Sequence, residues 1–306
     1  MKRFILFAVV IALPGVQHPG NAQQLFSNLS ASEKKLYREH VVGGQPDGNV
    51  PVYVRQGYVM RYNATYRIPE WVCYHIEKDY LKGPKREKRF SAFKTDIDTP
   101  DPVRTSDYTG TNYARGHMAP FFAMGGDRDG NSRYSNAEDI HKDPYDDETV
   151  YQANYMSNIC PQDQDALNGA GGPWYKLETF IRKDLVGGRR SKELNVYAGA
   201  IVSNPDQCKI LTNKHGATGI AIPDKFYQIL IYQDKKTGDY ITGAFLFPHV
   251  TSKKDLPSKD LFDYMVPVDS IEKETDLDFL HALSAAKQKK TESKTNRDFW
   301  EALASD

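Results

Sequence analysis

The sequence predicts a mixed α+β fold built around an antiparallel sheet. Five segments rich in β-branched and aromatic residues have the length of strands, and one longer segment carries apolar residues at helical spacing. Of the 306 residues, 40% are apolar and 12% aromatic, which is enough for a substantial core. Strands and helices packed around one core are typical of the α+β class.

The strand candidates form two groups, one before and one after the long helix. Residues 58–62 and 71–76 form the first group, with a turn between them. Residues 194–202, 226–233 and 240–247 form the second. We found no internal repeat, so one domain is expected to contain all five.

The long helix lies between these groups. Gly171-Gly172 breaks the chain, Pro173 suits a first helical turn, and Gly187-Gly188 ends the segment. Its apolar residues recur three or four positions apart: Trp174, Leu177, Ile181 and Leu185. A second, short helix is predicted to begin at Asp269, because Glu272 three residues later completes a capping box.

The N-terminus resembles an export signal. Lys2 and Arg3 precede an apolar run over 4–13, and Gly20-Asn21-Ala22 provides small residues for cleavage. The alternative is a membrane anchor, but the run is short for a bilayer, and no other stretch is long enough to cross one. We therefore expect a secreted or periplasmic protein without a membrane partner.

The remaining chain divides by composition. We assign a signal peptide (1–22), a polar N-terminal lead-in (23–50), a catalytic domain (51–284) with a surface insertion (124–149), and a charged C-terminal tail (285–306). The three cysteines are Cys73, Cys160 and Cys208, an odd number that leaves at least one thiol unpaired within a monomer. The sequence leaves open their pairing and whether the chain forms a homodimer.

Charge alone does not indicate a nucleic-acid binder. The chain has 40 basic and 40 acidic residues, so removing Lys2 and Arg3 leaves 38 against 40, a net charge of −2. Binding to phosphates would then depend on local patches such as the basic run 78–94. This run contains Lys82, Lys85, Arg86, Lys88 and Arg89. A solvated loop explains the run about as well as phosphate binding.

Two polar motifs carry the chemistry. In the first, residues 113–120 (YARGHMAP), Arg115 and His117 flank a glycine that permits close backbone approach. A neutral imidazole can deprotonate water near pH 7, and arginine suits an anionic substrate. A partly buried, hydrogen-bonded histidine is the structural alternative.

The second motif concentrates amides and carboxylates before and on the long helix. It includes Asn158, Gln162 and Asn168, followed by Glu178 and Arg182. Glu178 and Arg182 lie four residues apart and share a helix face, so an intrahelical salt bridge is the simpler explanation. Asn158 and Gln162 also suit turns.

Taken together, the motifs resemble the DNA/RNA non-specific endonucleases of the ββα-metal fold. The resemblance rests on RGHMAP at 115–120, SNI-x-PQ at 157–162, LN at 167–168 and W-x-x-LE at 174–178, in that order. Flanking similarity extends it over about 55–283. The resemblance implies an endonuclease that hydrolyses phosphodiester bonds of DNA and RNA, leaves 5′-phosphates and uses Mg²⁺, with Mn²⁺ as a substitute.

The resemblance also implies a role for each matching residue. His117 matches the general base, Asn168 the protein ligand of the metal, and Glu178 the carboxylate that holds the metal's water shell. Arg115 and Arg182 match residues that bind or neutralise phosphate, and Arg89 matches a further arginine more loosely. Mg²⁺ keeps several waters and accepts few protein ligands, so one amide and one outer carboxylate suffice. Because phosphates dominate binding, we expect little sequence preference.

Two departures motivate alternatives. Ala114 stands where the family has Asp or Asn, and the glycine-rich stretch 169–172 is about two residues longer. A nucleic-acid-binding protein without useful catalysis, and a phosphodiesterase of small or lipid phosphoesters, are therefore weighed beside the nuclease. A gel shift without DNA cleavage would identify the former, and turnover of a chromogenic phosphodiester with intact plasmid the latter.

The insertion contains a further motif, Asp127-Arg128-Asp129-Gly130-Asn131. It resembles the start of a calcium loop, but it lacks the remaining ligand spacing and the closing glutamate. We interpret it as a polar turn.

Overall fold

The structure is a computed structural model that describes residues 23–84, 86, 90, 92–136, 143–189 and 191–304. The predicted signal peptide and Arg89 lie outside the described residues, as do 137–142 of the predicted insertion. A seven-stranded sheet forms the centre, and every neighbouring pair in it is antiparallel. In spatial order its strands are β1 (Tyr53–Val54), β2 (Val59–Asn63), β3 (Ile68–Ile76), β6 (Leu194–Ile201), β9 (Lys225–Gln233), β10 (Tyr240–Pro248) and β11 (Met265–Val266).

Two smaller antiparallel pairs lie outside this sheet. One pairs β4 (Tyr113–His117) with β5 (Ile159–Asp163), and the other pairs β7 (Lys209–Asn213) with β8 (Gly216–Ile222). Strand β4 holds Arg115 and His117 of the first polar motif, and β5 holds Gln162 of the second. The sequence had not predicted either pair, because their polar residues lack the apolar composition expected of a strand.

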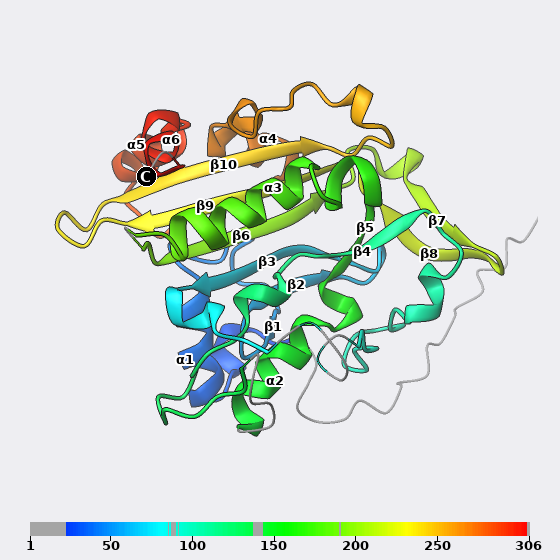
Figure 1. The fold of residues 1–306 in the computed structure, drawn as a ribbon, viewed down its shortest axis with the longest axis horizontal. Helices are drawn as coiled ribbons and strands as arrows, with labels where there is room; N and C mark the ends of the chain where they lie inside the picture. The colour runs from blue at the N-terminus through cyan, green and yellow to red at the C-terminus, as the bar shows by residue number, and fades with distance from the viewer. Residues whose placement is uncertain are drawn as a thin grey trace, which may run out of the picture.

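Apolar side chains cover both faces of the central sheet. On one face, helix α3 (Pro173–Phe180) packs Trp174 edge-on against Phe226 of β9 and Phe247 of β10. On the other face, Trp71 and Tyr197 pack with residues that adjoin α1 (Ala31–His40) and belong to α4 (Val268–Thr275). Figure 1 shows α3 alongside β6 and β9, with α1 and α2 (Pro144–Ala153) below the sheet.

The fold therefore agrees with the predicted class, an antiparallel sheet flanked by helices. The five predicted strands correspond to β2, β3, β6, β9 and β10, and the predicted long helix begins at Pro173 as expected. After α3, a π-type segment (Ile181–Val186) continues the helix to Gly187. The unit formed by β4, β5 and α3 is the ββα element of this fold.

Both ends of the described chain contain helices. The lead-in contains α1, which begins with a capping box between Ser30 and Glu33. The tail contains α5 (Ala285–Glu292) and α6 (Arg297–Ala304). It is packed rather than free, because Trp300 is fully buried and its Nε1 donates to the Thr242 carbonyl oxygen at 2.9 Å.

The predicted capping box at Asp269 is wrong. Helix α4 begins at Val268, and its cap residue is Pro267, which contributes no side-chain hydrogen bond. Glu272 Oε1 instead accepts from the backbone N–H of Phe279 at 2.8 Å. The Glu272 carboxylate therefore binds the chain that follows the helix, and not the N–H groups at the helix start.

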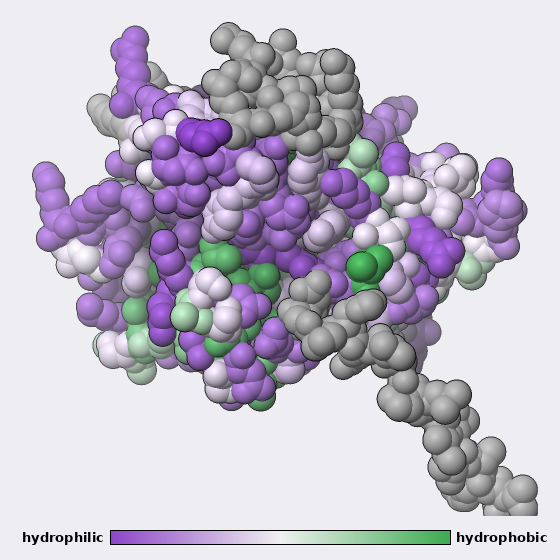
Figure 2. All heavy atoms as spheres, turned by 90° about the horizontal axis from the view of Figure 1, so that it is seen from below, coloured by the Kyte–Doolittle hydropathy of each residue, from purple (hydrophilic) through white to green (hydrophobic). Residues whose placement is uncertain are grey.

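The surface and the thiols complete the description. All three cysteines are free, and Cys73 and Cys160 are buried. Among the described residues, no helix combines the length and hydrophobicity needed to span a bilayer. The face seen from below in Figure 1 is largely hydrophilic (Figure 2).

Candidate active site

The strand pair β4–β5 places His117 at the end of β4. Its neighbour Met118 donates its backbone N–H to the Asn158 carbonyl oxygen at 3.0 Å. The Asn158 side chain binds Ala119 twice, accepting from its N–H at 2.8 Å and donating to its carbonyl at 2.9 Å. Asn158 is fully buried, so this pair of hydrogen bonds holds the segment after His117 in one position.

The His117 ring is buried, with 7% of the residue exposed. Its Nε2 lies 3.1 Å from Asn154 Oδ1, and its Nδ1 lies 3.4 Å from Arg86 Nη2. Burial is the main cause that lowers the pKa of His117 to about 3, and the charges of Arg86 and Arg115 act in the same direction. The imidazole is therefore neutral at physiological pH.

The hydrogen bonds of Asn154 determine which nitrogen of His117 carries the proton. Asn154 Nδ2 donates to the carbonyl oxygens of Phe90 at 2.7 Å and Val150 at 3.3 Å. Because both amide hydrogens are engaged, Oδ1 faces the imidazole and accepts from Nε2–H. The lone pair is then on Nδ1, the nitrogen that a general base would use.

A second amide pair fixes Asn168, which ends the segment Gln164–Asn168 after β5. Asn168 Nδ2 donates to Gln162 Oε1, so the Asn168 carbonyl oxygen is left as an acceptor. Gln162 is fully buried and faces Gly116 across the strand pair. A Cβ at Gly116 would overlap the Gln162 side chain, so this glycine is required for the amide pair.

Glu178 lies on α3 and accepts from Trp174 Nε1 at 2.9 Å. Burial raises the pKa of Glu178 to about 7, opposed by the Trp174 hydrogen bond and by the charges of Arg182 and Arg86. In the described part of the chain, no ion pair within 4.0 Å joins Glu178 to Arg182. The intrahelical salt bridge that the sequence suggested is therefore not formed: Glu178 accepts from Trp174, and the Arg182 guanidinium lies over the Phe122 ring.

One cavity of about 320 Å³ brings these groups together. Its lining includes five of the predicted site residues: Arg115, His117, Asn168, Glu178 and Arg182. The sixth, Arg89, lies outside the described residues. The longer glycine stretch does not separate Asn168 from Glu178, because Gly171 adopts a φ of +89° and Gly172 donates its N–H to the Gly169 carbonyl oxygen at 2.8 Å.

Arg86 lines the same cavity, although the sequence had only placed it within a basic run. Aromatic rings support the three arginines of the cavity: Arg86 lies 5.4 Å from the Phe121 ring, Arg115 4.5 Å from Phe93, and Arg182 4.8 Å from Phe122. Among the described residues, none of the three forms an ion pair. The cavity therefore presents positive charge that suits an anionic ligand.

Sequence reasoning also missed Asn154. It lies three residues before the 157–162 motif, and nothing in its neighbours indicates a contact with a histidine 37 positions earlier. Ala114 pairs with Gln162 across the strands and makes no side-chain hydrogen bond that would hold the His117 loop. Asn158 supplies that support instead.

Comparison with known proteins identifies a family for this chain. A family model described as DNA/RNA non-specific endonuclease matches residues 40–286. The chain is 29% identical to a nuclease of Serratia marcescens over 265 residues, which covers 84% of this chain and 85% of that protein. It is 25% identical to the human mitochondrial nuclease EXOG, covering 81% of this chain and 65% of that protein.

A mitochondrial nuclease of Saccharomyces cerevisiae is also similar, with 25% identity over 77% of this chain and 67% of that protein. Among solved structures, a chain of the EndoG/EndoGI complex superposes with a TM-score of 0.61 at 20% identity. The superposition covers 85% of this chain and 95% of that one. This structural likeness supports the fold described above.

Proposed function

Because the chain belongs to the DNA/RNA non-specific endonuclease family, we propose that it hydrolyses internal phosphodiester bonds of both DNA and RNA, with His117 as the general base. The observation that carries the proposal is the state of His117, a neutral imidazole with its lone pair on Nδ1 in a cavity lined by three arginines. Such a base can accept a proton from water without first losing its own.

The same cavity contains oxygen donors that fit a hard divalent cation. Asn168 Oδ1 is left as an acceptor by the Gln162 contact, and Glu178 uses one carboxylate oxygen for Trp174. Mg²⁺ prefers oxygen ligands and retains several waters, so we assign Asn168 as its protein ligand and Glu178 as the group that binds its waters. When bound, the ion would neutralise charge on the phosphate.

The remaining residues of the cavity orient the imidazole and bind the phosphate of the substrate. Asn154 holds the imidazole in the reactive tautomer, and Arg86, Arg115 and Arg182 would bind phosphoryl oxygens through paired N–H groups. These contacts would bind the phosphate backbone rather than the bases, so cleavage should show little sequence preference. From the family resemblance, we expect the products to carry 5′-phosphates.

The test compares wild type with His117→Ala on supercoiled plasmid and on structured RNA, each with Mg²⁺, Mn²⁺ or EDTA. We expect metal-dependent cleavage of both substrates and a loss of about 10²–10⁴-fold in kcat for the variant. His215→Ala, an exposed histidine in the β7–β8 turn, is the matched control and should retain full activity. If His117→Ala cleaves like wild type, or if wild type only shifts DNA on a gel, the proposed role is wrong.

Export is the second part of the proposal. It rests on the charged and apolar composition of residues 1–22. The relatives do not support export by themselves, because two of them are named as mitochondrial proteins. Expression of the full chain in a bacterium followed by fractionation tests it. Recovery outside the cytoplasm with an N-terminus near residue 23 supports export, whereas an uncleaved cytoplasmic product opposes it.

A further inference from the structure

A group of acidic side chains lies in the loop before α2 and in the first turn of that helix. None of the residues proposed to bind the catalytic metal or the phosphate belongs to this group. The loop folds around Asp127, whose Oδ1 accepts from the N–H groups of Gly130 at 2.8 Å and Asn131 at 3.1 Å. Asp129 binds Asn131 through both carboxylate oxygens, at 3.1 and 3.0 Å. These contacts form the polar turn that the sequence predicted, and they hold two carboxylates close together.

Asp146, in the first turn of α2, faces this loop. Only 3% of the residue is exposed, and its Oδ1 accepts from the Arg128 backbone N–H at 2.8 Å. Its Oδ2 is buried and has no hydrogen-bond partner. Burial, followed by the charges of Asp143, Asp129 and Asp127, raises the pKa of Asp146 to about 6. A buried carboxylate oxygen without a partner is costly, so it points to a missing ligand.

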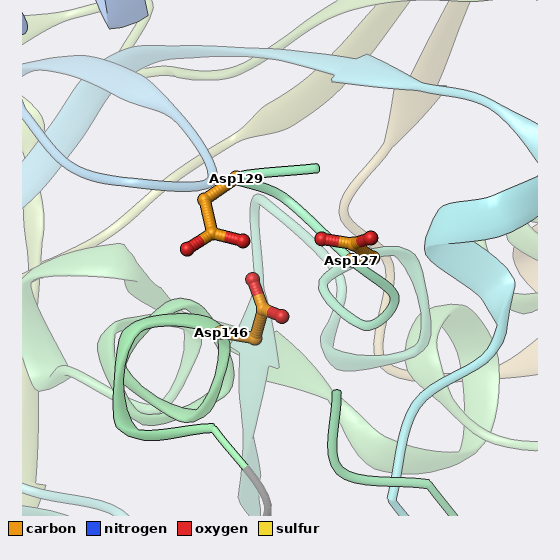
Figure 3. A group of neighbouring side chains, drawn as sticks. All are labelled: Asp127, Asp129 and Asp146. Atoms are coloured by element: carbon orange, nitrogen blue, oxygen red, sulfur yellow. The ribbon is translucent and has the colours of Figure 1, made fainter. Parts of the chain in front are cut away.

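The three carboxylates converge on one point. One oxygen from each of Asp127, Asp129 and Asp146 lies within 4.8 Å of the others, and Figure 3 shows the carboxylates turned toward one another. The neighbouring cation, Arg128, is engaged elsewhere: its side chain donates to the Gly125 and Ala123 carbonyl oxygens, and its guanidinium carbon lies over the Tyr80 ring. It makes no ion pair with the cluster.

We propose that Asp127, Asp129 and Asp146 bind a structural Ca²⁺ ion separate from the active site. Three hard anionic oxygens suit Ca²⁺, which accepts six to eight oxygens in irregular geometry. Mg²⁺ is less suitable because it requires near-octahedral geometry and keeps most of its waters. Asp146 replaces the closing glutamate that the sequence motif lacks, and it reaches the loop from 17 residues beyond Asp129.

The ion would join the loop to the first turn of α2. The last residue of that helix, Ala153, precedes Asn154, which contacts His117. Binding should therefore stabilise the fold without supplying a catalytic group. An ion that binds only the folded state raises the melting temperature, on the order of 5 °C when free Ca²⁺ is about a hundredfold above Kd.

The test measures Ca²⁺ binding to the full chain by isothermal titration calorimetry in excess Mg²⁺, which occupies the catalytic site. Wild type should bind one Ca²⁺ at this loop, and Asp146→Asn should weaken that binding at least tenfold. The matched control is Glu292→Gln, another buried acid in a separate acidic cluster. If wild type binds no Ca²⁺, or if Glu292→Gln removes the binding and Asp146→Asn does not, the assignment is overturned.

Thermal unfolding separates loss of the ion from loss of folding. In EDTA, Asp146→Asn removes a charge from an uncompensated acidic cluster and should melt at or above wild type. With Ca²⁺ the order should reverse, because only wild type gains the ion. A variant that melts below wild type in EDTA would show that the Asp146 carboxylate supports the fold by itself, and would overturn the proposal.

Discussion

The state of His117 makes the stability of the folded protein depend on pH. In the folded chain the pKa of His117 is lowered to about 3 by burial and by Arg86 and Arg115, whereas the ordinary value is 6.5. Between these two pKa values, the His117 imidazole is protonated in the unfolded chain and neutral in the folded chain. The free energy of unfolding should therefore fall as pH decreases below 6.5, and this loss is absent above that pH.

The magnitude follows from the pH difference. At pH 5.0 the solution lies 1.5 units below the unfolded pKa of 6.5, and the folded ring is still neutral. Each unit corresponds to about 1.4 kcal/mol, so His117 should cost about 2 kcal/mol of stability at pH 5.0 relative to pH 7.5. His40 is also buried with a lowered pKa and adds to this loss, whereas the raised pKa values of Asp146, Glu178 and Glu292 act in the opposite direction.

The assay is urea unfolding of wild type and His117→Gln in EDTA at both pH values. Glutamine has no titration and retains a donor for Asn154, so the difference between the two pH dependences isolates His117 from His40. Wild type should lose about 2 kcal/mol more than the variant. Equal losses in both proteins, or an NMR titration of the native His117 ring near pH 6.5, would refute the neutral buried imidazole.

Three further variants test the surroundings of the base. Asn154→Asp adds a negative charge next to His117 and should move the acid limb of the nuclease pH profile upward by about 1–3 units, measured as kcat against pH; an unmoved limb would contradict the contact. Gly116→Ala places a methyl group against β5, and it should lower kcat and reduce the free energy of unfolding by about 1–3 kcal/mol, measured by urea titration. Arg86→Ala should weaken DNA binding and reduce the salt slope by about 1, whereas Arg38→Ala on α1 should match wild type; equal slopes for both would contradict a phosphate contact.

The sequence predicted best those elements that are buried in the central sheet. β3, β6, β9 and β10 carry continuous aromatic and aliphatic runs, because each is covered on both faces. Helix α2 was missed because its sequence, PYDDETVYQA, is polar, and its buried Asp146 contacts the loop before the helix. Its start was nevertheless encoded, since Asp143 caps it and Pro144 opens it.

The candidate site was predicted in its residue types rather than in its contacts. Arg115, His117, Asn168, Glu178 and Arg182 came from motif resemblance and line one cavity. The tautomer of the imidazole and the third arginine could not be predicted, because they depend on chain segments far apart in sequence. The tautomer depends on the position of Asn154 after the end of α2, and the third arginine reaches the cavity because of the conformation of its loop. The neighbouring residues in the sequence indicate neither feature.

Asn158 and Gln162, which the sequence analysis also considered as turn residues, explain how two short motifs can position the whole candidate site. Asn158 uses its carbonyl and its amino group on Ala119, so it fixes the backbone that follows His117. Gln162, four residues later on β5, accepts from Asn168 and thereby leaves a carbonyl oxygen for a cation. Strand β5 and the residue directly before it therefore orient the proposed base and the proposed metal ligand together. A shift of β5 by one residue would turn Gln162 to the opposite face and separate the two functions, so the register of this strand determines the geometry of the site.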